Sequence, residues 1–470
     1  MIFNLRYVPC LAVVLTMLAA CMSPVGPQDS LIKTLPQWNQ LTSITTTADL
    51  NTPLAIGPEA DVDQKWWKHF DDPTLDDLIT EALTNNKTLR IAQARVEEAR
   101  AGRRAARSLL LPQISGSVGA QRTNLGYFTA DQEIGFREAE FIASWDFDLF
   151  GKNQARTAAA NAVLESEEAT RQGVRVGLLA EVARNYFDMR NYERQIDLTR
   201  LNLEKQKKTL EMIQAQMQAT KASDLDVQRA GAQVSTTESL MPLLQTAHDA
   251  AVNRLNVLQG CPPGSKDVLL KTKRHLKPLD HHILIAAPAK VLANRPDIRV
   301  AERRFAASIS AKYVAKAAWL PDISLTGFFG RQVSTPFSST PWGISALLVQ
   351  PILNFEQIQA QIDAADAQQE QAFLNYQQTV LVALEDMENA LSGYLHETIR
   401  NASLSASADQ NRKAAALVTK KYNSGYASFL DVLVAESNLL IAESGQASSD
   451  YRLRDDLVNV YAAAGGGWSD

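Results

Sequence analysis

The sequence contains little cysteine and histidine and no excess of basic residues. Among its 470 residues, three cysteines are too few for a disulfide scaffold, and six histidines without metal-ligand spacing argue against a zinc enzyme. Lysine and arginine number 47 against 52 aspartates and glutamates, a balance that argues against nucleic-acid binding. The motifs of serine hydrolases, zinc peptidases and phosphate-binding loops are missing from the sequence. We therefore expect a protein that is not an enzyme and that carries no metal or cofactor.

The N-terminus has the pattern of a secretory signal peptide. Residues 1–20 carry one charge, Arg6, and then an apolar run that ends at Ala20 and is too short to span a bilayer well. The run leads into Leu-Ala-Ala before Cys21, which resembles a bacterial lipobox; an ordinary cleaved signal with an unrelated cysteine is the alternative. The resemblance implies that Cys21 becomes a lipidated first residue. Met22 after it matches an outer-membrane address.

The chain contains an internal duplication. The segments 85–90 (NNKTLR) and 294–299 (NRPDIR) match, and at the same offset a Leu-Pro-x-Ile-Ser sequence recurs. At a slightly smaller offset, Ala-Ser-x-Leu-Asp-Val occurs at 222–227 and again at 427–432. A repeat of roughly 200 residues is too long for a solenoid unit, so we interpret it as a duplicated structural half.

The sequence pattern of each half predicts a helix, two strands and a long helical hairpin. The proline-free stretches are far longer than a typical globular helix of about 11–12 residues, and part of the second has heptad spacing. Polar or Gly/Pro-bearing loops, 122–138 and 332–341, are expected between the paired strands. The opening helices are expected at 94–110 and 301–319, the strands at 114–121, 141–149, 323–331 and 342–350, the long helices at 154–219 and 357–422, and the returning helices at 225–258 and 429–464.

The expected strands carry aromatic residues on one face. Phe141, Trp145 and Phe147 recur at every second or fourth position, and Trp342 opens the last strand. Four such strands cannot close a transmembrane barrel, which needs at least about eight, whereas three chains would supply twelve. We therefore expect a trimer whose barrel presents these four aromatic side chains on one face. A small sheet beside a helical rod is the alternative that the pattern leaves open.

Six motifs in order resemble the TolC-type outer-membrane efflux proteins, in particular their NodT-type lipoprotein branch. The resemblance covers nearly the whole chain after the signal. The motifs are Val25-Gly26-Pro27, WWKHFDDP at 66–73, WDFDLFG at 145–151, NRPDI at 294–298, QPIL at 350–353 and GGGW at 465–468.

The resemblance implies a mainly α fold with a membrane β-barrel. A trimeric, 12-stranded outer-membrane barrel with four strands per chain would continue into a long α-helical coiled-coil tunnel in the periplasm. The implied function is the outer-membrane channel of a tripartite efflux or export system for drugs or other small molecules. The implied partners are two further copies, a periplasmic adaptor (membrane-fusion) protein, an inner-membrane pump and outer-membrane lipid, with no nucleic acid. A lipid-anchored coiled-coil structural protein or adhesin is the alternative.

The resemblance also implies a closure at the periplasmic end, near the hairpin turns. Asp226 and Tyr422 match the residues of a link between neighbouring hairpins, and Asp431 matches an acidic ring at the narrowest point. The type protein of the family has an arginine where this chain has Ala427, so an extra contact to Asp226 is missing here. An aspartate in the first turn of a helix also stabilises that helix, so helix capping is a second role compatible with the first.

The predicted organisation follows from these assignments. The sequence leaves the exported substrate, the adaptor and the energy source of the pump open. The segments are a signal peptide at 1–20, a lipid-anchored extended segment at 21–72, the first structural repeat at 73–260, an equatorial linker at 261–287, the second repeat at 288–464 and a tail at 465–470.

Overall fold

The computed structural model describes residues 38, 54–57, 61–124, 133–220, 222–265, 279, 283–334 and 337–468. Cys21 lies outside these residues. The described chain forms two compact units. One contains Gln93–Thr170 and Asp297–Thr379, and the other contains the described residues of Thr34–Ala92, Arg171–Pro296 and Val380–Asp470.

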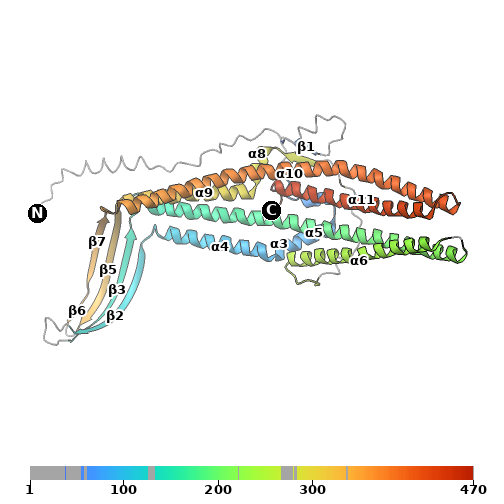
Figure 1. The fold of residues 1–470 in the computed structure, drawn as a ribbon. Helices are drawn as coiled ribbons and strands as arrows, with labels where there is room; N and C mark the ends of the chain where they lie inside the picture. The colour runs from blue at the N-terminus through green and yellow to red at the C-terminus, as the bar shows by residue number, and fades with distance from the viewer. Residues whose placement is uncertain are drawn as a thin grey trace. The chain divides into compact units, whose positions relative to one another are not determined.

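The two halves of the chain contain the same elements in the same order (Figure 1). Each has a short helix, a second helix, two strands of one sheet and a long helical hairpin. In the first half these are α3 (Pro73–Asn85), α4 (Lys87–Ser108), β2 (Gln113–Asn124), β3 (Glu133–Asp146), α5 (Lys152–Gln218) and α6 (Asp224–Leu258). In the second half they are α8 (Pro288–Asn294), α9 (Pro296–Lys316), β5 (Asp322–Ser334), β7 (Trp342–Val349), α10 (Phe355–Asn423) and α11 (Phe429–Ala463).

The long helices begin and end within a few residues of the expected positions, but other boundaries differ. The opening helices begin at Lys87 and Pro296, earlier than expected, and proline is well suited to a first helical position. The expected loop regions are partly strand, because β2, β3 and β5 continue their hydrogen-bond ladder into polar sequence. A short strand, β6 (Phe337–Ser339), and the 3-10 helix η2 (Trp66–Phe70) were not expected. The last turn of the helix expected at 301–319 is the 3-10 helix η3 (Ala317–Trp319). The predicted domain boundaries remain predictions.

The sheet has the order β2-β3-β5, and β5 pairs with both β6 and β7. β6 pairs with the end of β5 and β7 with its beginning, so the two together act as one interrupted strand opposite β5. Pro341 lies in the interruption, and its carbonyl accepts a hydrogen bond from the Gly330 N–H at 2.9 Å. Proline cannot donate to a ladder, which accounts for the break. In the described chain, β2 and β7 each have one side that pairs with no other strand.

The second unit contains a second, unexpected sheet of two strands. β1 (Leu54–Gly57) pairs in parallel with β4 (Ile283–Ala286), which joins the N-terminal segment to the linker between the repeats. The apolar runs are only four residues long, so sequence pattern alone could not distinguish them from loop. Among the described helices, none is both long enough and apolar enough to cross a membrane.

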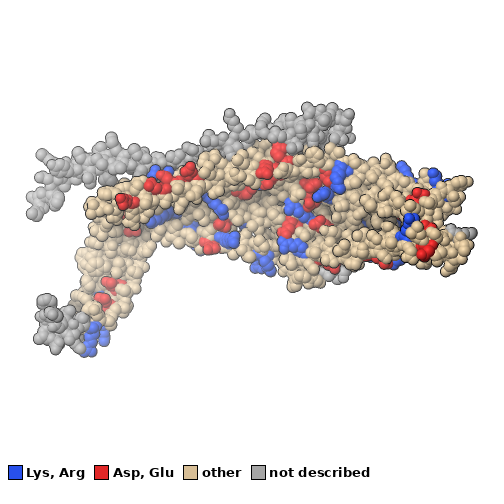
Figure 2. Space-filling model, viewed as in Figure 1, with Lys and Arg blue, Asp and Glu red and all other residues tan. Residues whose placement is uncertain are grey.

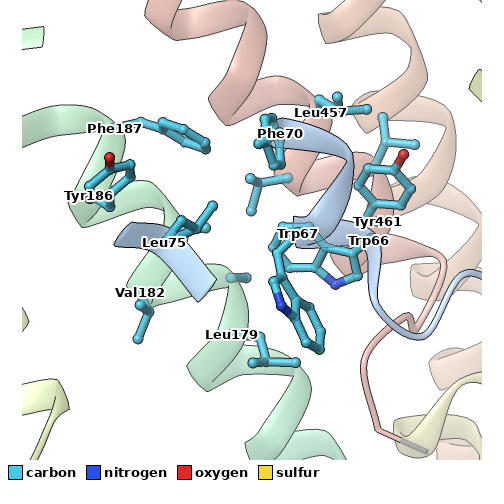
Figure 3. Packing of buried hydrophobic residues seen from close by; sticks show 14 of the residues in the cluster. Trp66, Trp67, Phe70, Leu75, Leu179, Val182, Tyr186, Phe187, Leu457 and Tyr461 are labelled. Atoms are coloured by element: carbon cyan, nitrogen blue, oxygen red, sulfur yellow. The ribbon is translucent and has the colours of Figure 1, made fainter. Parts of the chain in front are cut away.

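The main core of the second unit gathers large side chains from distant parts of the sequence (Figure 3). Trp66 stacks on Tyr461 with ring centroids 5.4 Å apart, and Phe70 packs on Phe187 at 4.8 Å. Tyr186 is fully buried, and its hydroxyl donates to Asp72, which also caps α3 by accepting from the Thr74 N–H. The WWKHFDDP motif is therefore a packing and capping element.

A matching contact ends the returning helix of each half. In the first, the Asn86 side chain donates to the Leu258 carbonyl at 2.8 Å. In the second, Arg295 at the equivalent position donates to the Ala463 carbonyl at 2.9 Å and pairs with Asp386 at 3.0 Å. Each contact satisfies a carbonyl that the helix end leaves unpaired. Arg295 of the Asn-Arg-Pro-Asp motif therefore caps the C-terminal end of the returning helix α11.

Candidate functional site: sheet faces and helical tips

The sheet has two chemically different faces. Side chains alternate between faces along a strand, and the register aligns Phe141 with Gly116, Phe329 and, through Phe329, Trp342. We call this side the apolar face; its members include Ile114, Val118, Ala139, Phe141, Trp145, Leu325, Phe329, Trp342, Ile344 and Leu348. The opposite side is the more polar face; its members include Ser115, Ser117, Glu138, Glu140, Ser144, Asp146, Thr326, Gln332 and Ser345, together with the apolar Ile142, Phe328, Leu347 and Val349. We call it the polar face.

The apolar face is exposed in the single chain. Val118 is 89% exposed, Ile344 84% and Trp342 72%, so large side chains on this face have little protein contact. Contiguous exposed apolar surface of this kind marks a protein or membrane interface. In the view of Figure 2 the sheet is mostly tan, with few charged side chains.

Three of the four predicted aromatic residues lie on the apolar face. Phe141 and Trp145 belong to β3 and Trp342 to β7. Phe147 lies just past the end of β3, where its N–H donates to the Ile323 carbonyl at 2.8 Å. Its ring packs edge-on against Trp145 with centroids 5.3 Å apart, so the four residues still belong to one surface.

The WDFDLFG motif connects the sheet to the long helix α5. The carboxylate of Asp148 accepts from the backbone N–H groups of Asn153 and Gln154 at 3.0 and 2.8 Å, which caps the start of α5. Gly151 takes a positive φ of 74°, which glycine adopts without strain. Lys152 contacts both carboxylate oxygens of Asp322 at 2.9 and 3.0 Å and so ties α5 to the start of β5.

The second candidate region is the helical tip, where α5 turns into α6 and α10 turns into α11. The two returning helices begin with the same capping box. Ser223 accepts from the Asp226 N–H, and the Asp226 carboxylate accepts from the Ser223 N–H and hydroxyl. Ser428 and Asp431 repeat this arrangement at 2.7–3.2 Å. Each aspartate therefore has the helix-capping role that was the compatible alternative.

A small apolar cluster joins the two hairpins at the tip. Ile213 is fully buried, and Ala230, Phe429 and Val432 pack with it, so all members come from α5, α6 and α11. Tyr422 of α10 lies at the edge of this cluster, with its ring 5.9 Å from that of Phe429. The hairpins of one chain thus contact each other directly at their ends.

The expected hydrogen bond from Tyr422 to Asp226 is not the one that this chain makes. The Tyr422 hydroxyl donates to the Gln216 side-chain oxygen of α5 at 2.8 Å. Burial raises the pKa of the Tyr422 hydroxyl, and the negative charge of Asp226 raises it further. Gln216 carried no sequence signal, since a glutamine near a helix end is ordinary.

Asp431 is exposed at the tip, and its pKa is held below the usual value by the hydrogen bonds from the Ser428 hydroxyl and backbone. The carboxylate is therefore negative at neutral pH. Among the described residues, no group of three or more His, Cys, Asp or Glu side chains is placed to hold a metal ion.

The chain matches a family model described as "Outer membrane efflux protein" over residues 78–260 and 287–466. It is 29% identical to the pyoverdine export outer membrane protein OpmQ of Pseudomonas putida, covering 98% of this chain and 97% of that protein. It is 28% identical to nodulation protein T of Rhizobium leguminosarum bv. trifolii, with 84% of this chain and 85% of that protein covered.

Solved structures share the fold. The outer-membrane channel OprN superposes with a TM-score of 0.85 at 30% sequence identity, covering 95% of this chain and all of that one. The open state of the Neisseria gonorrhoeae MtrE outer-membrane channel superposes with a TM-score of 0.83 at 24% identity, covering 95% and 99%. The expected fold class is confirmed by these likenesses.

Proposed function

The chain belongs to the outer membrane efflux protein family, and from this we propose that three copies form the outer-membrane exit channel of a tripartite export system. It is an outer-membrane efflux protein, not a protein of an enzyme family. The channel would pass small molecules from a pump and adaptor in the cell envelope to the outside. Pyoverdine and toluene appear in the names of relatives, which supports small organic compounds as the cargo class.

The two-faced sheet with open edges is the observation that carries the proposal. A sheet edge in lipid leaves backbone N–H and C=O groups without partners, at a cost of several kcal/mol for each group. Pairing β2 of one copy with β7 of the next would satisfy both edges. Three copies would then give twelve long strands, with the apolar face toward lipid and the polar face toward the lumen, the alternation typical of outer-membrane barrels.

The helical tip supports a periplasmic adaptor as a partner. Tyr426 is 85% exposed in the turn between α10 and α11, and Leu225 and Leu430 are about half exposed near the starts of α6 and α11. Exposed apolar side chains at the end of a helical hairpin suit docking against the helices of another protein. The inner-membrane pump would be reached through that adaptor.

A lipid anchor at Cys21 completes the proposed mature protein. Each buried acyl CH₂ contributes about 0.8 kcal/mol of membrane affinity, so the chains would assist sorting of a protein that the barrel itself holds in the membrane. The anchor rests on the lipobox resemblance alone.

We assign the gate to Asp226, Tyr422 and Asp431 at the tip. Threefold symmetry would place three Asp431 carboxylates around one axis, and rings of acidic side chains favour cations. Asp431→Ala is expected to reduce the preference for cations, measured as the reversal potential across a planar bilayer in a salt gradient. Ser428→Ala is the matched control, since it weakens the same helix cap and keeps the charge. An unchanged reversal potential in Asp431→Ala would leave only the capping role.

Channel conductance tests the function as a whole. Purified protein added to a planar bilayer is expected to give stepwise, long-lived conductance increases, and deletion of the gene should sensitise cells to exported compounds. The coiled-coil structural protein or adhesin predicts neither result. A protein that inserts without conductance, and whose loss leaves every tested compound equally toxic, would refute the export channel.

A further inference from the structure

Among the charged side chains that the structure describes in the sheet, the two faces differ in sign, and the register places position 133, a glutamate, in the outermost row of the apolar face. The described strands of the five-stranded sheet contain three basic residues, and register and alternation place all three on the apolar face: Arg122, Arg137 and Arg331. The four carboxylates whose side chains the structure describes in the same strands all lie on the polar face: Glu138, Glu140, Asp146 and Asp322. Basic residues on the lipid-facing surface of a barrel cost about 2–4 kcal/mol at the membrane midplane and much less near the interfaces, so their position along the strands is informative.

The three arginines are gathered at one end of the apolar face. Arg331 is opposite Ala139, Arg137 is opposite Ala120 and Val333, and Arg122 is opposite Gly135. They therefore occupy three successive rows, all beyond the row of Phe141, Phe329 and Trp342. Blue side chains are visible at one end of the sheet in Figure 2, and the rest of the sheet in that view is without them.

These rows coincide with the edge of the proposed membrane band. Ile323 and Arg331 lie on the same face of β5, eight residues apart, which corresponds to about 27 Å along the strand at about 3.4 Å per residue. At a strand tilt of about 40°, this is about 21 Å across the membrane, close to the apolar band of about 25 Å on outer-membrane barrels. The arginines therefore lie at the level of lipid headgroups.

The end of the sheet that carries the arginines faces the outer leaflet in the proposed orientation. β2 begins after α4 and β3 leads into α5, so the helices join the sheet at its opposite end. With the helices in the periplasm, the arginine rows meet the outer surface of the membrane. This step rests on the proposed function.

We propose that Arg122, Arg137 and Arg331 form a belt that binds the phosphate groups of the outer-leaflet glycolipid. Guanidinium groups present a planar set of donors that matches phosphate oxygens in pairs, and their long stems lie along apolar surface while the charge reaches the headgroup layer. The carboxylates on the opposite face would repel the same phosphates, and their placement toward the lumen keeps them away from the lipid. The belt is a lipid-binding site outside the export path.

The test measures lipid retention by the full-length trimer. Wild type, the triple variant Arg122→Gln/Arg137→Gln/Arg331→Gln and a control with the same charge change, Arg90→Gln/Arg95→Gln/Arg104→Gln on the exposed surface of α4, are purified in one detergent. Each is incubated with bisphosphorylated lipid A or with lipid A lacking both phosphates, and bound lipid is counted by native mass spectrometry. Wild type and the α4 control are expected to retain about tenfold more bisphosphorylated lipid A than the triple variant.

Three outcomes would overturn the proposal. They are equal retention by the triple variant, equal retention of the dephosphorylated lipid by wild type, and complete displacement of the lipid by millimolar inorganic phosphate, which would indicate a site for free phosphate. Arg331→Lys keeps the charge without the paired donors and should give intermediate retention, which keeps the proposal testable if the triple variant assembles poorly. Conductance of the same samples reports separately on the channel: a conducting triple variant with undiminished lipid refutes the belt alone, and a trimer without conductance refutes the proposed function alone.

Discussion

A single hydroxyl at the tip links the two hairpins of one chain. Tyr422 of α10 donates to Gln216 of α5, and Asp226 is near enough for its charge to raise the pKa of that hydroxyl. Gln216 is the acceptor that Tyr422 uses in this chain, and Asp226 is the acceptor that a rearranged tip is proposed to offer. A closure built on one neutral hydrogen bond per chain is weak, since each contributes about 1 kcal/mol, and three copies must act together.

Tyr422→Phe is expected to loosen the tip and to raise single-channel conductance and sensitivity to large antibiotics. Adding Asp226→Ala should increase the effect, because it removes the second acceptor. Tyr426→Phe is the control, since it removes the same hydroxyl from a side chain that is 85% exposed. Equal conductance in the Tyr422 and Tyr426 variants would contradict a gating role for the hydroxyl.

Asp456 of α11 is expected to make the stability of the protein depend on pH. Burial raises the pKa of Asp456 to about 6 from a usual 3.8, and the neighbouring Asp455 and Glu397 carboxylates contribute. Because the folded chain binds this proton more tightly than the unfolded chain, stability falls as the pH rises from about 4 to 6. Asp456→Asn is expected to raise the unfolding temperature at pH 7.5, with a gain of about 1 kcal/mol or less after solvent screening, and to leave it unchanged at pH 4.

Differential scanning fluorimetry between pH 4 and 8 checks this prediction. Asp224→Asn is the control, because Asp224 belongs to the exposed surface of α6. A wild type whose unfolding temperature does not fall between pH 4 and 6 relative to Asp456→Asn would show that Asp456 has an ordinary pKa.

Within the sheet, two glycines of β5 have opposite steric surroundings. A Cβ added at Gly330 would lie 2.9 Å from the Ala139 carbonyl oxygen and 2.9 Å from the Glu140 Cβ. At Gly327 the nearest atom, the Gly343 carbonyl oxygen, would be 3.9 Å away. Gly330 therefore permits the close approach of β3 to β5, and Gly327 has room for a methyl group.

Gly330→Ala is expected to lower the yield of folded protein in the outer membrane several-fold, since overpacking of this kind costs about 1–3 kcal/mol. Gly327→Ala is the matched control and should assemble like wild type. The folded fraction is measured by the shift in gel mobility between unheated and heated samples. Similar yields for the two variants would mean that β3 can move to accommodate the methyl group.

The elements differ in how much of them the sequence could predict. The long hairpins were predictable because 154–219 and 357–422 contain no proline and end near Ser223 and Ser428, whose capping boxes start the next helices. The strand ends at Asn124 and Ser334 were not, because backbone pairing with a neighbour extends a strand into polar sequence. The fourth aromatic residue, Phe147, was expected within the strand, but Asp148 turns the chain there to cap α5. The Gln216 contact depends on two hairpins meeting in space, which no local pattern encodes.

At the scale of the whole molecule, the edges of β2 and β7, which pair with no other described strand, are expected to decide the assembly. Each edge presents a row of backbone groups that a neighbouring copy can pair, and the exposed apolar face adds a large surface that water solvates poorly. The single chain is therefore an incomplete unit. The trimeric barrel could be predicted because four strands are too few to close a transmembrane barrel.

Native mass spectrometry of the detergent-purified protein is expected to give three copies, each heavier than the polypeptide from Cys21 onward by the mass of its acyl groups. Cys21→Ser is the control for the anchor and should lose that additional mass. A monomer with a protease-resistant core would refute the trimer. A trimer of unmodified polypeptides would refute the lipid anchor and leave the barrel intact.

The core around Trp66 can pack only after the C-terminal part of the chain has been synthesised. Trp66 stacks on Tyr461, and the Gln64 side-chain oxygen accepts hydrogen bonds from the N–H groups of Gly467 and Trp468, both at 3.1 Å. The chain is synthesised from its N-terminus, so the segment around Gln64 waits for partners made 403 residues later. The last turns of α11 and the GGGW motif therefore complete the core around Trp66. A copy interrupted before them can form helices but lacks the residues that pack on Trp66 and bind Gln64. Its core is therefore incomplete before it joins two other copies.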